Sequence, residues 1–201
     1  MPARRTGSRI GTVERRTNET TVAVRLDVDG RGRAEVNTGL GLIDHFLDAL
    51  ATHARFDLNL AVRGDLEVDD HHTIEDAAIV LGQALDAALG DRRGIVRFAD
   101  ASVPLDESLA RAVVDCSGRP GAWVDLGLVR PAIGPVATEN IEHFLVSFAT
   151  SARCTVHIDV LRGRNDHHRA EAAFKAFAVA LRRAVAIDPI PRMPSTKGSL
   201  T

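Results

Sequence analysis

The sequence contains no tyrosine and only two cysteines, and it has neither a long apolar run nor a strong excess of one charge. Cys116 and Cys154 form no CxxC motif, so a disulfide framework and a cysteine-rich zinc site are excluded, and two buried thiols in a reducing compartment are expected. No segment approaches the roughly 20 apolar residues of a membrane span, and no apolar stretch follows Arg4 and Arg5 as in a secretory signal. We therefore expect a cytoplasmic protein without membrane contact.

The charges are nearly balanced, with 25 basic and 27 acidic residues and a formal net charge of -2. This balance argues against a nucleic-acid partner bound through overall positive charge. The shares of hydrophobic residues, 45%, and of charged residues, 26%, are typical of a folded globular chain. The absence of GxxxxGK(S/T), GxGxxG, HExxH and GxSxG segments argues against P-loop, Rossmann, zincin and α/β-hydrolase proteins.

Two histidine motifs occur twice, in the same order. The segment DHFLDAL at 44–50 resembles EHFLVSF at 142–148, and DHHTIE at 70–75 resembles DHHRAE at 166–171. The lone histidine and the HH pair are separated by 26 residues in the first copy and by 24 in the second. The chain therefore reads as an internal duplication, with a first half-repeat at 1–92 and a second half-repeat with a C-terminal tail at 93–201, together forming one domain.

Each half shows the order strands, helix, strand, helix. Alternating apolar residues predict strands in the first half at 9–16, 20–28, 33–38 and 56–63. Helical spacing predicts helices there at 42–54 and 71–89. The second half repeats the pattern, with strands within 95–127, a loop at 131–135, a helix at 139–152, a strand at 154–161 and a helix at 167–186. This order predicts an α+β fold in which two similar halves share one helical core.

The HH pairs have the geometry of ligands for two different metal ions. Neighbouring residues on a helix point about 100° apart, whereas His71 and Glu75, or His167 and Glu171, share a face. A pseudo-twofold axis between the halves would therefore relate two similar sites, each with ligands from different helices. The six clustered histidines and two glutamates supply three imidazoles and one carboxylate per site: His45, His71, His72, Glu75, His143, His167, His168 and Glu171.

Imidazole and carboxylate ligands without thiolate suit Mn, Fe, Zn or Ni. Four protein ligands on an octahedral ion leave two positions for water or substrate, which is a catalytic arrangement. A closed four-coordinate ion that only clamps helices or subunits is the alternative.

The segments DDHHTIED, NDHHRAEA, DHFLDAL and ENIEHF and the tail PSTKG resemble the imidazoleglycerol-phosphate dehydratase family of histidine biosynthesis. The resemblance runs from about Arg9 to Leu200, although Phe46 stands where the family commonly has methionine. It implies a duplicated α+β unit with helices between two four-stranded sheets, similar to a ribosomal-protein domain. It also implies a homo-oligomer of 24 subunits, with two Mn²⁺ per active site held between neighbouring subunits.

The resemblance implies how the ligands divide and what they do. One ion would be bound by His45, His72, His167 and Glu171, and the other by His71, Glu75, His143 and His168. The implied reaction is loss of water from imidazolyl glycerol phosphate to give imidazolyl oxopropyl phosphate. Ions on both ring nitrogens would allow the substrate ring to ionise to imidazolate. The ring could then expel the neighbouring hydroxyl to give a diazafulvene.

Proton transfer and phosphate binding need further residues. The family pattern points to Glu19, Glu171 or Asp106 for removal of the carbon-bound proton, and the sequence leaves the choice open. Glu19 is also expected to contact the substrate, whose phosphate would be bound by Arg97, Arg119, Lys175, Ser195 and Lys197. Two alternatives stay open: a dimetal hydrolase acting on a small phosphate ester, and a non-enzymatic assembly clamped by metal.

Overall fold

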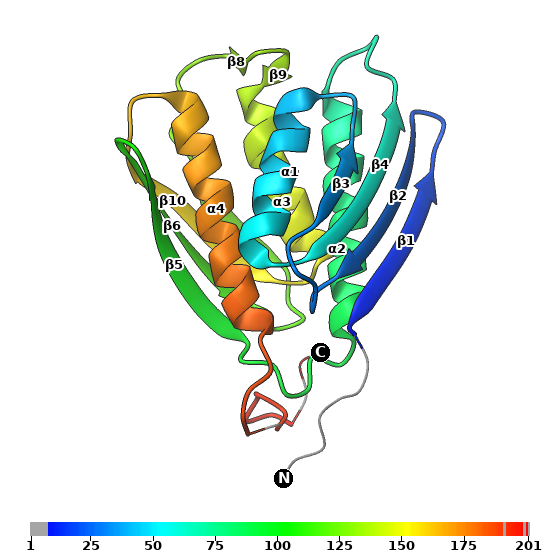
Figure 1. Ribbon diagram of the computed structural model, residues 1–201, viewed down its shortest axis with the longest axis vertical. Coiled ribbons are helices and arrows are strands. Elements are labelled where there is room, and N and C mark those ends of the chain that lie inside the picture. Colours follow the sequence, from blue (N-terminus) through cyan, green and yellow to red (C-terminus); the bar gives the residue numbers. More distant parts are fainter. Residues whose placement is uncertain (1–7, 191, 199, 201) are drawn as a thin grey trace.

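The computed structural model describes residues 8–190, 192–198 and 200. A layer of four helices lies between two four-stranded sheets (Figure 1). The first half contributes β1 Ile10–Arg16, β2 Thr20–Asp27, β3 Ala34–Asn37, α1 Gly41–Ala54, β4 Asp57–Gly64 and α2 His71–Leu89. The second contributes β5 Phe98–Leu105, β6 Ser108–Asp115, β7 Gly121–Asp125, β8 Ala132–Ile133, β9 Val136–Ala137, α3 Thr138–Ser151, β10 Thr155–Arg162 and α4 Asp166–Val185.

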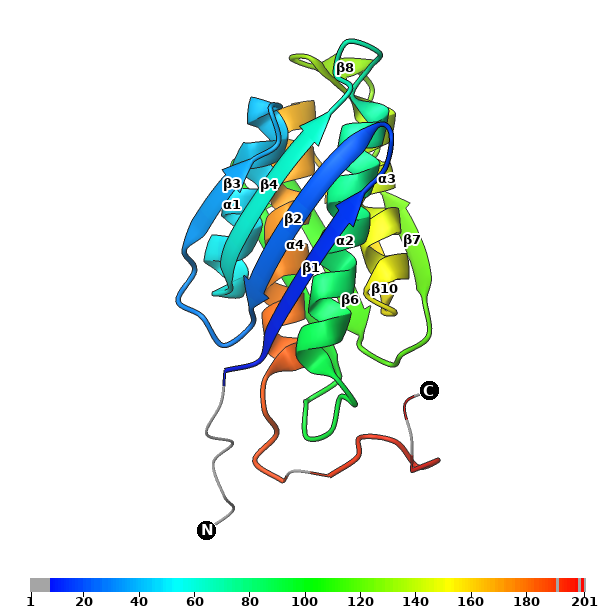
Figure 2. The same ribbon diagram turned by 90° about the vertical axis from the view of Figure 1, so that its right-hand side faces the viewer.

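The two sheets have the same topology. The strand order is β1-β2-β4-β3 in the first and β5-β6-β10-β7 in the second. In each sheet one edge strand, β3 or β7, runs parallel to its neighbour, and the other pairs are antiparallel. Figure 2 shows the first sheet lying across the helices. This repeated topology confirms the predicted α+β duplication, while the division between residues 92 and 93 stays a prediction.

Alternating side chains explain why these segments form half-buried strands. Val22, Val24 and Leu26 on β2 point to the helices and are buried, whereas their neighbours face outward. Strand β4 shows the same alternation, with Leu58 and Leu60 on the inner side. A period of two residues matches the pleat, so each sheet has one apolar face to cover.

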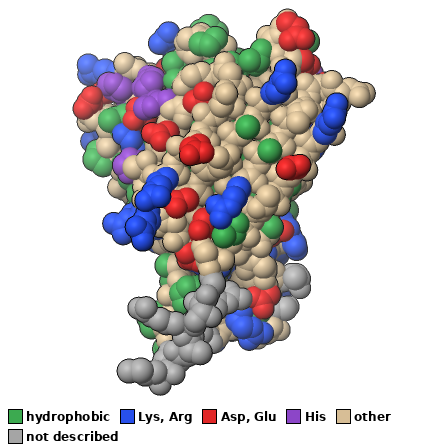
Figure 3. All heavy atoms as spheres, turned by 45° about the vertical axis from the view of Figure 1, so that its right-hand side comes forward, with side chains coloured by type: hydrophobic (Ala, Val, Ile, Leu, Met, Phe, Trp, Pro, Cys, Tyr) green, Lys and Arg blue, Asp and Glu red, His purple; other side chains and the backbone are tan. Residues whose placement is uncertain are grey.

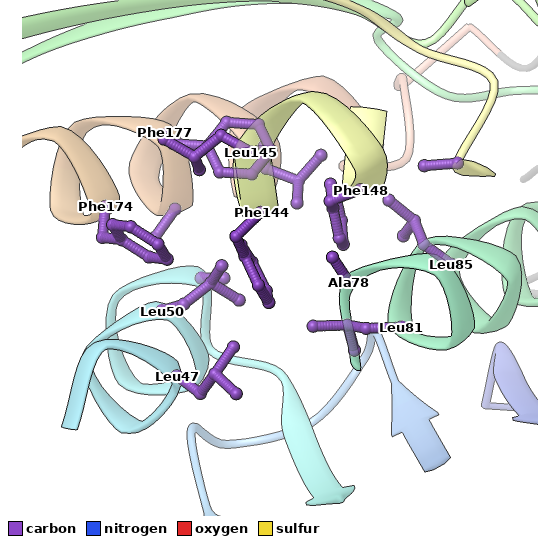
Figure 4. Close-up of a cluster of buried hydrophobic side chains, with 14 of the residues drawn as sticks. Leu47, Leu50, Ala78, Leu81, Leu85, Phe144, Leu145, Phe148, Phe174 and Phe177 are labelled. Carbon is purple, nitrogen blue, oxygen red and sulfur yellow. The ribbon is translucent and has the colours of Figure 1, made fainter. Parts of the chain in front are cut away.

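The helices meet in one shared core (Figure 4). Phe144 of α3 and Phe174 of α4 are buried with ring centroids 5.6 Å apart, and Leu47 of α1 and Leu81 of α2 lie in the same cluster. Helices α2 and α3 approach so closely that a Cβ at Gly82 would lie 2.6 Å from the carbonyl oxygen of Phe148. The core thus joins helices from both halves.

All four helices begin at one end of the molecule, and the segment after α4 lies at the other end (Figure 1). The first turns of α2 and α4 are fixed by polar side chains, because Asp69 accepts a hydrogen bond from the backbone of His71 and Asn165 accepts one from His167, both at 2.9 Å. Both HH pairs are consequently held at the same end of the fold.

The segment at 131–135 differs from the predicted loop, because it contributes to a small hairpin of β8 and β9. Gly134 has a φ of 59°, which permits the tight turn, and the flanking Ile133 and Val136 are buried. No helix in the described part of the chain has the length and apolar character needed to cross a membrane.

Candidate metal centre

The first cluster lies between α1 and α4. Nε2 of His45 is 3.3 Å from Oε2 of Glu171, and Nε2 of His167 is 3.2 Å from the same oxygen. The two imidazole rings stack with centroids 5.5 Å apart. The other carboxylate oxygen, Oε1, is 2.7 Å from Nζ of Lys175. One oxygen of Glu171 therefore faces two imidazole nitrogens while the other is held by an ammonium group.

The second cluster lies between α2 and α3. Nε2 of His143 is 2.9 Å from Oε1 of Glu75, and the ring of His143 stacks on that of His71 with centroids 5.0 Å apart. Nδ1 of His71 is 2.9 Å from Oδ1 of Asn140, which leaves its Nε2 free to bind an ion. This cluster repeats the chemistry of the first, with two stacked imidazoles and one carboxylate.

Each cluster combines residues from both halves of the chain. The lone histidine of the first half, His45, stacks on His167 of the second, and the lone histidine of the second half, His143, stacks on His71 of the first. This exchange is the arrangement expected of a pseudo-twofold axis between the halves. Figure 3 shows histidine side chains gathered toward the end at which the helices begin.

The donor atoms suit a divalent cation. Within each three-residue cluster the candidate ligand atoms all lie within 4.8 Å of one another, and the side chains are only partly buried. Neutral imidazole and carboxylate are the ligands of Mn, Fe, Zn and Ni sites. Three protein donors leave room for further ligands on each ion.

The second histidine of each HH pair lies outside these clusters. Nδ1 of His72 is 3.1 Å from Oδ2 of Asp65, and Nδ1 of His168 is 2.8 Å from Oε2 of Glu107. An open hollow of about 730 Å³ lies beside His168. The structure thus brings together six of the eight predicted ligands, as two sets of three, and separates His72 and His168 from them.

Two of the predicted proton-transfer residues lie beside those separate histidines. Oε1 of Glu19 is 3.9 Å from Nε2 of His72, and Oδ2 of Asp106 is 3.9 Å from Nε2 of His168. Glu19 belongs to the turn between β1 and β2, and Asp106 to the turn between β5 and β6. Both side chains are exposed, at 54% and 74%, so they are accessible to an incoming molecule.

The pKa values of two carboxylates at this end of the molecule, Glu171 and Glu107, are lowered by different neighbours. Burial raises the pKa of Glu171, but hydrogen bonds with Lys175 and His45 outweigh it and bring the pKa below its usual value. The hydrogen bond from His168, together with backbone N–H groups of Asn165 and Arg164, holds the pKa of Glu107 well below its ordinary range. Both groups are therefore charged near neutral pH.

Neighbouring carboxylates raise the pKa values of the two histidines that lie outside the clusters, His72 and His168. The hydrogen bond to Asp65 raises the pKa of His72 above its ordinary value, and the hydrogen bond to Glu107 does the same for His168. In both cases the carboxylate also increases the basicity of the ring, which strengthens it as a ligand once the proton has left.

The predicted phosphate-binding residues divide between the two ends of the molecule. Lys175 lies beside the first cluster, as described above. The remainder gather near the C-terminal tail, at the end away from the helix N-termini (Figure 2): Arg97, Arg119, Ser195 and Lys197.

Arg97 connects the members of this second group by hydrogen bonds to Asp115 and to the tail. Its guanidinium donates to both oxygens of Asp115, at 2.7 and 3.1 Å, and to the carbonyl of Pro194 at 2.7 Å. Arg119 approaches Asp115 at 4.0 Å. The tail continues into a turn in which the backbone of Lys197 donates to Oγ of Ser195 at 3.2 Å. Arg97 thus anchors the tail, and the Arg119 side chain stays 57% exposed.

Sequence reasoning missed the residues that hold the histidine rings. Asp65 and Glu107 were not singled out, and neither was the chain of contacts in which Asp70 accepts from the side chain of Asn140 and Asn140 meets His71. Asp70 lies next to an HH pair, which was the available signal. Glu107 and Asn140 lie more than 60 residues from their histidines, and no local pattern connects them.

The fold and these clusters define a duplicated α+β protein with two equivalent histidine–carboxylate groups at one end. A family model of imidazoleglycerol-phosphate dehydratase matches residues 38–181. The chain belongs to this family.

Similar proteins and similar solved structures belong to the same family. The imidazoleglycerol-phosphate dehydratase of Zymomonas mobilis is 50% identical over 194 residues, covering 96% of this chain and 99% of the relative. That of Phytophthora nicotianae is 56% identical over 196 residues, but the match covers 98% of this chain and only 43% of the longer relative. The crystal structure of the Pyrococcus furiosus protein has a TM-score of 0.81 at 35% identity, covering 93% of this chain and 99% of that one. The Staphylococcus aureus structure has a TM-score of 0.78 at 37% identity, covering 88% and 98%.

Proposed function

We propose that this protein is the hydro-lyase of histidine biosynthesis that removes water from imidazolyl glycerol phosphate to give imidazolyl oxopropyl phosphate. The observation that carries the proposal is the pair of equivalent clusters, each with two stacked imidazoles and one carboxylate, in a chain of this family. A cytoplasmic location is supported by two buried free thiols.

Two Mn²⁺ ions per active site are the proposed cofactor. His45, His167 and Glu171 would hold one ion and His71, Glu75 and His143 the other. His72 would complete the first site and His168 the second. Such ions would supply positive charge that lowers the pKa of the substrate imidazole N–H, by the effect that a metal has on bound water.

A neighbouring copy would supply the missing parts of each site. His72 and His168 are separate from the three-residue clusters of their own chain, with Nδ1 of each already bound to a carboxylate. The tail with the proposed phosphate residues follows the C-terminal end of α4, at the other end of the molecule from the clusters near the helix N-termini (Figure 1). These two separations favour a homo-oligomer with active sites between subunits, for which we propose 24 subunits.

The carboxylates of this chain have different roles, metal binding for Glu171 and proton transfer for Glu19. Glu171 is paired with Lys175 and its pKa is lowered, so it is a ligand rather than a base. Glu19 is exposed and lies beside His72, where it would accept the carbon-bound proton of the substrate; Asp106 occupies the corresponding turn beside His168. The hydroxyl group on the carbon next to the ring leaves with one proton as water, which balances the carbon-bound proton given up to Glu19. The resulting enol becomes the ketone when its hydroxyl proton is replaced by one on the carbon that lost the hydroxyl group.

Lys175 and the tail would orient the other end of the substrate. Arg119, Ser195 and Lys197 present a guanidinium, a hydroxyl and an ammonium group, which together suit a phosphate ester. Arg97 would act mainly by holding the tail in place, because its donors are engaged by Asp115 and Pro194.

Turnover of imidazolyl glycerol phosphate by the purified protein tests the proposal. We expect ketone formation that stops after removal of divalent metal with a chelator and returns after addition of Mn²⁺. Release of inorganic phosphate in place of ketone would identify a hydrolase. Tight binding of metal without any conversion would identify a structural clamp.

A further inference from the structure

The two histidines outside the clusters have the same surroundings. Nδ1 of His72 meets the carboxylate of Asp65 at 3.1 and 3.3 Å, and Nδ1 of His168 meets that of Glu107 at 2.8 Å. In both cases Nε2, at the other side of the ring, has a second carboxylate oxygen only at 3.9 Å, and the side chain is about a third exposed, at 32% and 30%. A carboxylate on Nδ1 places the proton there and leaves the lone pair on Nε2, the form that binds metal.

The internal duplication does not account for this likeness, because the two carboxylates occupy different places in their halves. Asp65 directly follows β4, whereas Glu107 directly precedes β6. After the equivalent strand β10 the chain has Gly163 and Arg164. Before the equivalent strand β2 it has Glu19, which lies near Nε2 of His72 and not near Nδ1. In both halves a carboxylate thus contacts Nδ1 of the second histidine of the HH pair, but the carboxylates come from non-equivalent positions. Because duplication does not explain this contact, we infer that it has a role of its own.

Each carboxylate is itself held in place. Oε1 of Glu107 accepts hydrogen bonds from the backbone N–H groups of Arg164 at 3.0 Å and Asn165 at 2.9 Å, at the start of α4. The other oxygen of Glu107, Oε2, is thereby directed at His168, which lies three residues after Asn165. Asp65 begins a turn closed by a hydrogen bond of 2.8 Å from the backbone of Val68 to its carbonyl, and its side chain is 19% exposed.

We propose that Asp65 and Glu107 are positioning residues that aim Nε2 of His72 and His168 at divalent cations held by the three-residue clusters of neighbouring copies. This inference rests on the proposed function. It adds that each of the two ions depends on one particular carboxylate that is not a ligand. Asp65 controls the ion that His72 completes, and Glu107 controls the ion that His168 completes.

The test is Mn²⁺ titration of the full-length, chelator-stripped protein in its natural assembly, followed by the electron paramagnetic resonance signal of free Mn²⁺ at about pH 8, above the ordinary histidine pKa of about 6.5. The variants are Asp65→Asn and Glu107→Gln, which keep the size of each side chain but remove the charge that fixes the Nδ1–H tautomer. Glu67→Gln, in the same loop as Asp65, and Asp100→Asn, on β5, are matched controls because both side chains are exposed. Thermal unfolding and light scattering verify that each variant is folded and assembled.

We expect two Mn²⁺ per chain in the parent protein and in both controls. Each test variant should bind one of the two ions on the order of 10- to 100-fold more weakly and leave the other unchanged. The double variant should weaken both. Binding in Asp65→Asn and Glu107→Gln equal to that in the controls overturns the inference, and so does equal weakening of both ions by either single variant. Failure of the parent protein to bind Mn²⁺ would instead count against the proposed function.

Discussion

Nζ of Lys175 lies 2.7 Å from Oε1 of Glu171, one helical turn earlier on α4. The other oxygen of the same carboxylate is within 3.3 Å of two imidazole nitrogens. The ammonium group keeps Glu171 ionised and fixes its orientation, so that Oε2 stays directed between His45 and His167. This relationship separates the role of Glu171 from that of Glu19, which within the described residues lies 3.9 Å from His72 and forms no ion pair with a lysine or arginine.

Substitution of the two carboxylates should therefore have different effects on metal content. Glu171→Gln removes a charged donor, and we expect loss of one Mn²⁺ per chain together with at least a 100-fold fall in kcat, on the order found for metal-site and acid–base residues. Glu19→Gln should retain both ions and still lose about 100-fold in kcat, because only the proton acceptor is changed. Metal analysis with steady-state kinetics distinguishes the variants. Near-normal turnover by metal-loaded Glu19→Gln would remove Glu19 from the mechanism.

The tail should affect substrate affinity more than metal binding. Lys197→Ala removes an ammonium group proposed to contact the phosphate, from the tail segment after α4, which lies at the end of the molecule away from the helix N-termini (Figure 2). We expect KM to rise at least 10-fold, since a charge-assisted hydrogen bond contributes about 1.5–3 kcal/mol, with Mn²⁺ content unchanged. Arg93→Ala, an exposed arginine at the same end, is the control. Loss of metal with an unchanged KM would contradict the phosphate role.

Acid should weaken the turn that precedes β3. Hydrogen bonds from the backbone of Arg31 and Arg33 to Asp57 lower the pKa of that carboxyl below the model-compound value of 3.8. A lowered pKa stabilises the fold above pH 3.8, and that stabilisation is lost as the pH falls through the lower, folded-state value. We expect Asp57→Asn to reduce the free energy of unfolding by about 1 kcal/mol at pH 7 and by progressively less below pH 3.8. Urea unfolding of metal-free protein measures this, with the exposed Asp159→Asn as control. A difference that stays constant with pH would exclude the ionised carboxylate as its cause.

The close approach of α2 and α3 should make Gly82 sensitive to a single methyl group. Alanine is favoured over glycine in a helix by about 1 kcal/mol, but a Cβ here would lie 2.6 Å from the carbonyl oxygen of Phe148 and 2.8 Å from Cβ of Ser151. Overpacking costs about 1–3 kcal/mol, so we expect Gly82→Ala to destabilise the protein by about 1 kcal/mol. The exposed Gln83→Ala on the same helix should be neutral or slightly stabilising. An increase in stability for Gly82→Ala would show that the helices separate easily.

Much of the fold could be predicted because its signals are local and occur twice. The repeated HH motifs revealed the duplication, and the apolar spacing predicted the order of strands and helices that the structure has. The hairpin of β8 and β9 escaped prediction because its strands have two residues each, too few to show alternation. The pairing of His45 with His167 was implied by the family resemblance, but the stacking of their rings could not be foreseen from the sequence.

The contacts around the site could not be predicted, because they join residues that are far apart in the sequence. Glu107 meets His168 across 61 residues, and Arg97 meets Pro194 across 97. The separation of the tail residues from the clusters is likewise a property of the fold, because Lys175 and Lys197 are close in sequence but lie in different parts of the molecule.

The location of Mn²⁺ by anomalous scattering in crystals of the metal-loaded protein tests the central claim most directly. We predict two ions per chain, one bound by His45, His167 and Glu171 and the other by His71, Glu75 and His143, each completed by a histidine of a neighbouring copy and each with open positions for substrate. Two adjacent ions that share a carboxylate, or ions closed by four protein ligands with no open position, would contradict the account.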